Sequence, residues 1–112
     1  MKSSRGSKEK AAAADTDGVL RLHAEGVVAG EVVEELEESF LSALGRSNAP
    51  TVVLDLTRVS SLDSRGIAVC IGVLRECQKA GRSFSIEANA TIFHMMTMLN
   101  LQKAMTIREV AV

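Results

Sequence analysis

Strand patterns occur at four places along the chain. In residues 18–26, GVLRLHAEG, apolar and polar residues alternate, which predicts a half-buried strand with Leu20, Leu22 and Ala24 on its inner face. Residues 51–56, TVVLDL, are β-branched and mostly apolar, as in a central strand covered on both faces. Two further segments are expected to be extended: residues 82–88, RSFSIEA, as a strand, and residues 104–112, AMTIREVAV, as a last short strand or an extended end.

Three other segments have apolar residues at helical spacing. Residues 31–47, EVVEELEESFLSALGRS, predict an amphipathic helix that ends near Gly45. Residues 65–81, RGIAVCIGVLRECQKAG, predict a second helix that ends at Gly81, and residues 90–101, ATIFHMMTMLNL, predict a short third one. The expected core positions of these helices are Val32, Val33, Leu36, Phe40, Leu41 and Leu44; Ile67, Cys70, Ile71, Leu74 and Cys77; and Ile92, Met95, Met96 and Leu99.

The elements alternate between strand and helix from residue 18 onward. This order predicts a single α/β domain over residues 18–112, with a mixed, largely parallel sheet of four to five strands and helices packed against it. Residues 1–17 are charged and Ser-rich, then Ala-rich, so we expect a disordered N-terminal tail there. This tail lacks the apolar segment of a secretory signal.

The composition argues against several classes of function. The chain has 112 residues, of which 46% are hydrophobic and 24% are charged, and its formal net charge is −1. Because there is no basic excess and there are only three Phe with no Trp or Tyr, we expect no nucleic-acid partner. No run reaches the roughly 18 apolar residues of a membrane span, so we expect no direct membrane insertion.

The sequence contains no recognisable catalytic or cofactor-binding motif. The patterns GxGxxG, GxxxxGK[ST] and GxSxG are all absent. His23 and His94 have no set of partner ligands nearby in the sequence, and Cys70 and Cys77 would lie on one helix face, too far apart for a disulfide. We therefore expect a cytoplasmic protein that is not an enzyme, with two buried thiols and without a cofactor or metal.

The first predicted helix carries acidic residues on the side away from its apolar stripe. These residues are Glu31, Glu34, Glu35, Glu37 and Glu38. One interpretation is a solvated face whose early acidic residues interact favourably with the helix dipole. The other is an acidic docking surface, and the sequence leaves both open.

The stretch SSLDSRGIAVCIGVL, residues 60–74, joins an apolar strand to the second helix. Either Asp63 or Ser64 can cap this helix by accepting a hydrogen bond from its first turn, and Gly66 allows a close backbone approach. A modified hydroxyl also suits this place, because a helix N-terminus favours negative charge and a phosphate adds about −1.5 to −2 charges. Capping and modification of Ser64 both stay open on local physics.

Around this junction the sequence resembles the STAS domain, named for sulfate transporters and anti-sigma-factor antagonists. The resemblance is carried by TVVLDLTRVSSLDSRGIAVCIGVLRECQKAGRSFSI and by the downstream KAGRSFSIEANATIFHMMTMLNLQKAMTI, and it covers residues 18–108. The family signature is Asp-Ser-(Ser/Thr)-Gly-(Leu/Ile). It is matched in order by Asp63, Ser64, Arg65, Gly66 and Ile67, with Arg65 in place of the small hydroxyl residue.

The resemblance implies a partner-switching role in the regulation of transcription. In members of the anti-sigma-factor-antagonist type, the unmodified protein binds an anti-sigma factor that is also a Ser/Thr protein kinase, which releases a sigma factor. Phosphorylation of the serine after the aspartate ends this binding, and a phosphatase reverses it. By position, the resemblance implies that Ser64 is the phosphorylation site and that residues 63–67 bind the partner.

A second role implied by the resemblance is that of a structural STAS subunit. Such a subunit docks on the ATPase of a lipid-transport or other transporter complex and does not need phosphorylation. Many members of the family also have an N-terminal edge strand. We do not predict that strand here, because residues 8–17 are mostly alanine and charged residues.

Overall fold

The structure, a computed structural model, describes residues 11–111 of the chain. These residues form the five strands β1 (Ala11–Thr16), β2 (Val19–Val28), β3 (Thr51–Leu62), β4 (Ser83–Ala88) and β5 (Thr106–Glu109). They also form the helices α1 (Val32–Arg46), α2 (Ser64–Lys79) and α3 (Ala90–Met98), and the single 3-10 turn η2 (Leu101–Lys103).

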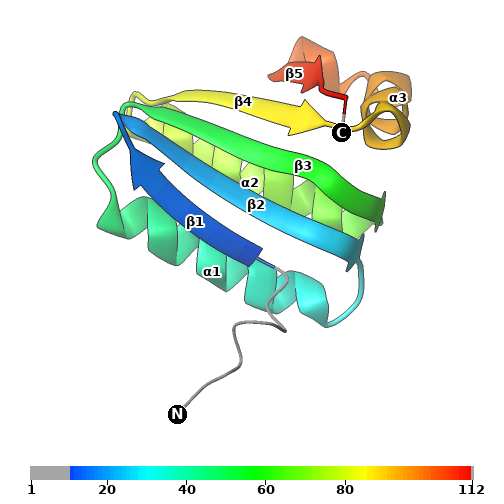
Figure 1. Cartoon of the computed structure of the whole chain (residues 1–112), viewed down its shortest axis with the longest axis horizontal. Helices are drawn as coiled ribbons and strands as arrows, with labels where there is room; N and C mark the ends of the chain where they lie inside the picture. The colour runs from blue at the N-terminus through cyan, green and yellow to red at the C-terminus, as the bar shows by residue number, and fades with distance from the viewer. Residues whose placement is uncertain (1–10, 112) are drawn as a thin grey trace.

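The strands form one sheet in the order β1-β2-β3-β4-β5 (Figure 1). β1 is antiparallel to β2, and the other three neighbouring pairs are parallel. The parallel pairs are connected by α1, α2 and α3 in turn, because parallel neighbours need a crossover connection. The prediction of one α/β domain with a mixed, largely parallel sheet and packed helices is therefore confirmed.

The first strand lies within the segment that the sequence assigned to a disordered tail. Residues 11–16 form β1 at the edge of the sheet, so the ordered domain starts before residue 18. Asp17 and Gly18 have φ values of 56° and 77° and form the tight turn to β2, as an Asp-Gly pair favours. Alanine has a low strand propensity, so β1 depends on its pairing with β2 and its packing on α1. The rest of the expected tail, residues 1–10, lies outside the described residues.

β2 and β3 are both longer than their sequence patterns indicated. β3 continues past TVVLDL to Leu62 and leads directly into Asp63. β2 continues through Gly26, which has a φ of 78°, to Val28, and the register between β2 and β3 shifts at two places. Such bulges let pairing continue past an irregular position. The two strands end side by side, with Val28 opposite Leu62, next to the start of α2.

One hydrophobic core lies between the sheet and the three helices. Leu20, Leu22 and Ala24 are buried in it, as predicted from the first strand pattern. The helices contribute Val33, Leu36, Phe40, Ala43 and Leu44 from α1, Val69, Cys70, Val73 and Cys77 from α2, and Ile92 and Met96 from α3. All three helices therefore cover the same face of the sheet.

The buried face of α2 is rotated from the predicted one. Val69 and Val73 lie in the core, whereas Ile67, Ile71 and Leu74 are only partly buried. Gly66 lies tightly against the ends of β2 and β3 and turns the residues three and seven positions later toward the sheet. The sequence pattern did not contain this constraint.

Two residues that we expected in the core are exposed. Leu41 is 40% exposed, because it lies at the outer margin of the apolar stripe of α1. Leu99 is 54% exposed, because α3 ends at Met98 and the helical period does not extend to the next residue.

The sheet face opposite the core is polar. Arg21 Nη2 lies 2.6 Å from Glu87 Oε1 and 3.4 Å from Asp55 Oδ2, and Arg108 Nη2 lies 3.8 Å from Glu87 Oε2. The prediction that TVVLDL is covered on both faces therefore holds on the core side and only in part on the other, where Val53 is buried. On the other side, ion pairs replace a second apolar layer around Asp55.

Candidate functional site

α2 begins directly after β3, and Asp63 caps it. The backbone of Asp63 is extended, with φ −96° and ψ −175°, and its Oδ1 accepts a hydrogen bond from the N–H of Gly66 at 3.0 Å. Its carbonyl oxygen accepts from the N–H of Ile67 at 3.0 Å. Both bonds are typical of an N-cap residue. Of the two caps that the sequence left open, the structure uses Asp63.

Ser64 is the first residue of α2, and its side chain is exposed. Because Asp63 already caps the helix, the fold does not need the Ser64 hydroxyl for this purpose. Among the side-chain hydrogen bonds within residues 11–111, those at this junction go to Asp63 and none involves Ser64 Oγ. The hydroxyl is therefore accessible at a helix N-terminus, where the dipole favours negative charge.

Asp63 also joins α2 to the loop between β2 and α1. The N–H of Gly30 donates to Asp63 Oδ2 at 3.4 Å, and the N–H of Asp63 donates to the carbonyl of Val28 at 3.3 Å. The hydrogen bonds from the N–H groups of Gly66 and Gly30, with the nearby Arg65, lower the pKa of Asp63 below its usual value. Asp63 is thus ionised at neutral pH and connects three segments of the chain.

Gly66 allows α2 to start in contact with the ends of two strands. A Cβ atom at this position would lie 3.3 Å from Val28 Cγ1 and 3.0 Å from Leu62 Cγ, and closer still to Leu62 Cδ1. The contact with Leu62 Cδ1 is shorter than real Cβ atoms make, and the other two are unusually tight, so only glycine fits without a shift of the Leu62 side chain or of the helix start. The glycine of the sequence signature therefore has a packing role.

The five signature residues differ in what they present to the outside. Ser64 and Arg65 are exposed, Asp63 and Ile67 are partly buried, and Gly66 is buried. Ile67 packs against the hydrophobic core. Ser64 and Arg65 therefore form the outer surface of the site, and the other three residues hold that surface in place.

The histidines and cysteines considered in the sequence lie away from this junction or face the core. His23 and His94 are exposed on β2 and α3. Burial raises the pKa of the Cys70 thiol to about 12 and also raises that of Cys77, so both cysteines act as core packing residues.

Within residues 11–111, no group of three or more His, Cys, Asp or Glu side chains could hold a metal ion. In the same part of the chain, no helix has the length and apolar character needed to cross a membrane.

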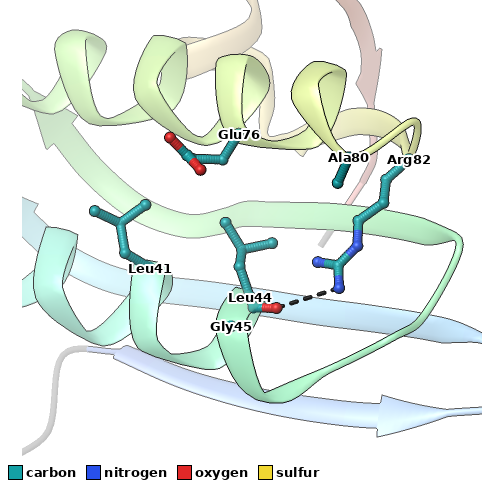
Figure 2. A pocket seen from close by; sticks show the side chains of 6 residues that line it. All are labelled: Leu41, Leu44, Gly45, Glu76, Ala80 and Arg82. Carbon is teal, nitrogen blue, oxygen red and sulfur yellow. Dashed lines mark hydrogen bonds between the residues drawn. The ribbon is translucent and has the colours of Figure 1, made fainter.

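A hollow of about 320 Å³ lies between the C-terminal halves of α1 and α2 (Figure 2). It is lined by Leu41, Leu44, Gly45, Glu76, Ala80 and Arg82. Arg82 donates to the carbonyl of Leu44 at 3.2 Å and to that of Ser47, which satisfies the C-terminal end of α1. Glu76 is twelve residues beyond Ser64 on α2, roughly 18 Å along the helix, so this hollow is separate from the Ser64 site.

Comparison with protein families identifies the chain. A family profile described as "Mlab, STAS domain" matches residues 11–109. The chain belongs to the STAS domain family. This confirms the resemblance seen in the sequence. The match to the STAS profile also begins at β1, the edge strand that the sequence analysis did not predict.

Solved structures with the STAS fold are similar over most of this domain. An anti-sigma factor antagonist from Mycobacterium paratuberculosis has a TM-score of 0.77 at 22% identity, with 89% of this chain and 85% of that chain covered. A putative anti-sigma factor antagonist from Thermotoga maritima has a TM-score of 0.79 at 18% identity, with 89% and 86% covered. The anti-sigma factor antagonist SpoIIAA in its unphosphorylated form has a TM-score of 0.72 at 16% identity, with 87% and 86% covered. A search of curated proteins finds no match to this STAS domain.

Proposed function

We propose that this STAS domain is a non-catalytic partner-switching regulator of the anti-sigma-factor-antagonist type. In its unmodified form it binds an anti-sigma factor that is also a Ser/Thr kinase, and phosphorylation of Ser64 ends this binding. The observation that carries the proposal is the exposed Ser64 hydroxyl beside a helix cap already supplied by Asp63. The similar solved structures named as anti-sigma factor antagonists support this role, and SpoIIAA has been solved unphosphorylated and phosphorylated.

The modification uses ATP as the phosphoryl donor. Ser64 Oγ forms a bond to the γ-phosphorus while the bond from that phosphorus to the β–γ bridging oxygen breaks and ADP leaves. The hydroxyl proton passes to a basic group of the kinase. A phosphatase reverses the change by hydrolysing the phosphoserine to serine and inorganic phosphate. The catalytic groups belong to these two enzymes, and this chain supplies the acceptor.

The phosphate acts as a charge switch on a surface that is already ordered. It adds about −1.5 to −2 charges at the N-terminus of α2, where the helix dipole stabilises them. A partner surface that fits neutral Ser64 loses affinity, because binding would remove this charge from water without a matching cation. The binding surface includes residues 63–67, and the exchange of partners takes place in the cytoplasm, where it controls the release of a sigma factor for transcription.

Phosphate mapping tests the proposal. The protein is incubated with ATP and the kinase of the anti-sigma class encoded nearest to its gene, and the site is located by tandem mass spectrometry. We expect one phosphate on Ser64, none on a Ser64→Ala variant, and unchanged labelling of Ser61→Ala, which removes a neighbouring exposed hydroxyl. No phosphate on Ser64, together with partner binding unchanged by Ser64→Asp, would refute the switch.

The description of the matching family favours a second candidate function. The profile is described as "Mlab, STAS domain", which fits a structural STAS subunit that docks on the ATPase of a lipid-transport or other transporter complex. In this case the start of α2 binds the ATPase and Ser64 stays unmodified. Co-purification with an ATPase from neighbouring transporter genes, lost in Arg65→Glu and accompanied by no phosphate on Ser64, would favour this candidate over the switch.

A further inference from the structure

The carboxylate of Asp63 holds two separate segments at once. Its Oδ1 accepts from the N–H of Gly66 in α2 at 3.0 Å, and its Oδ2 accepts from the N–H of Gly30 at 3.4 Å. Gly30 belongs to residues 29–31, which connect β2 to α1 and are called here the β2–α1 loop. The residue before Ser64 thus connects the switch position to a loop more than thirty residues earlier in the chain.

The β2–α1 loop passes this connection on to α1. The carbonyl of Gly30, whose φ is 67°, accepts a hydrogen bond from the N–H of Val33 in the first turn of α1 at 3.2 Å. Three hydrogen bonds therefore connect the starts of α1 and α2 in series: one between Gly66 and Asp63, one between Asp63 and Gly30, and one between Gly30 and Val33. Val27, just before the loop, is an apolar side chain that is 54% exposed.

We propose that Asp63 transmits the charge state of Ser64 to the β2–α1 loop, so that phosphorylation alters a second part of the partner surface. This rests on the proposed function, because it takes Ser64 as the modified residue. A phosphate on Ser64 repels the neighbouring carboxylate and competes with it for the N–H groups of the first turn of α2. The Gly30 bond yields first, because at 3.4 Å it is longer than a typical N–H···O bond, whereas the Gly66 bond is not.

The coupling changes what a partner recognises. A partner that contacts the β2–α1 loop or Val27 detects phosphorylation without touching the phosphate. Asp63 is then a positioning residue with two roles, the helix cap and the connection to the loop. Its substitution by asparagine keeps the size and one acceptor oxygen but removes the charge that the phosphate would repel.

The test is a double-mutant comparison by ¹H–¹⁵N NMR on the full chain. Ser64→Asp is the probe, because it adds negative charge without a kinase. We expect this substitution to shift the Gly30 amide more strongly than that of Gly45, which lies in α1 and has no neighbouring atoms within contact distance of its Cβ position. In an Asp63→Asn background, the shift of the Gly30 amide resonance caused by Ser64→Asp should be at most about half of the shift seen with Asp63 present.

Two controls separate coupling from a general effect of charge or folding. Ala68→Asp adds a carboxylate at an exposed position one turn further along α2, and it should not shift the Gly30 amide resonance. If Asp63→Asn does not fold, Asp63→Ser supplies a shorter neutral cap for the same comparison. A Gly30 amide that ignores Ser64→Asp, or that shifts equally with and without Asp63, would overturn the coupling. Neither result depends on a kinase, so the phosphate-mapping experiment remains an independent test of the proposed function.

Discussion

Asp63 and Ser64 are neighbours in the chain, but they have different roles at the start of α2. Asp63 accepts hydrogen bonds from Gly66 and Gly30, and Ser64 remains exposed. Because the cap is the preceding residue, the hydroxyl can be modified while the helix start is kept.

Ser64→Ala should therefore separate stability from regulation. The free energy of unfolding, measured in urea, should change by no more than about 0.5 kcal/mol, as for other exposed positions. Phosphorylation by the kinase should be lost completely. A loss of stability of about 1 kcal/mol or more would show instead that the hydroxyl supports the helix start.

Gly66→Ala should destabilise the domain by about 1–3 kcal/mol, as expected for overpacking. The added methyl would press on Leu62 and Val28, so either the Leu62 side chain or the start of α2 would have to shift. Urea unfolding measures the loss. Gly45→Ala is the matched control, because Gly45 also lies in a helix, α1, but has no atom near its Cβ position. This substitution should stabilise the domain by about 0.5–1 kcal/mol. Similar effects of the two substitutions would contradict the close packing at Gly66.

Among the elements, the C-terminal ends of β2, β3 and β4 lead into the β2–α1 loop, α2 and α3 in turn. β3 leads into α2, and Asn89 after β4 caps α3 by accepting from the N–H of Ile92 at 2.9 Å. The side chain of Asn89 also donates to the carbonyls of Thr57 and Val59 at 3.1 and 2.8 Å. One asparagine thus fixes α3 against the half of β3 that leads to Ser64.

Asn89→Ala should cost about 1–3 kcal/mol, because it removes a cap and leaves two carbonyls of β3 without this donor. The measurement is urea unfolding, with Asn48→Ala, an exposed loop asparagine, as the control that should change stability little. An effect of Asn89→Ala no larger than that of the control would mean that α3 is held by apolar packing alone.

The elements with a clear apolar period were predictable, and those that depend on distant partners were not. The alternation of Leu20, Leu22 and Ala24 gave the correct buried face of β2. The run of alanines in β1 has no such pattern, and its best local signal was the Asp17-Gly18 pair that forms the hairpin turn.

The candidate site was predictable in position but not in its internal bonds. The sequence placed Asp63 and Ser64 at a strand-to-helix junction, which the structure confirms. It could not decide which of the two caps α2, because both residue types are good caps. Nor could it foresee the bond to Gly30, since that contact depends on how β2 and β3 are paired.

At the scale of the whole molecule, one face of the sheet is covered by helices and the other carries charged side chains. Burial alone would raise the pKa of Asp55 on this polar face, but hydrogen bonds from Thr57 and Arg21 outweigh it and lower the pKa. The pKa of Asp63, at the site, is lowered as well. Both carboxylates therefore contribute stability in their ionised form.

The domain should accordingly lose stability in acid. A carboxylate whose pKa is lower in the folded state contributes fully above its unfolded-state pKa, and this contribution is lost as the pH falls toward the folded-state value. Urea unfolding at neutral pH and at several values below about pH 4 should show this decline. Asp55→Asn should make the decline shallower, and an unchanged slope in that variant would contradict its role.

The affinity for the partner should depend on the charge at Ser64. Isothermal titration calorimetry would measure the affinity of the anti-sigma factor for three forms of the protein: the unmodified protein, the form phosphorylated on Ser64, and Ala68→Asp as a control for added charge. We expect phosphorylation to weaken binding by about tenfold or more, a loss of at least about 1.4 kcal/mol, while Ala68→Asp retains most of the affinity. Equal affinity of the phosphorylated and unmodified forms would show that Ser64 is not a switch for this partner.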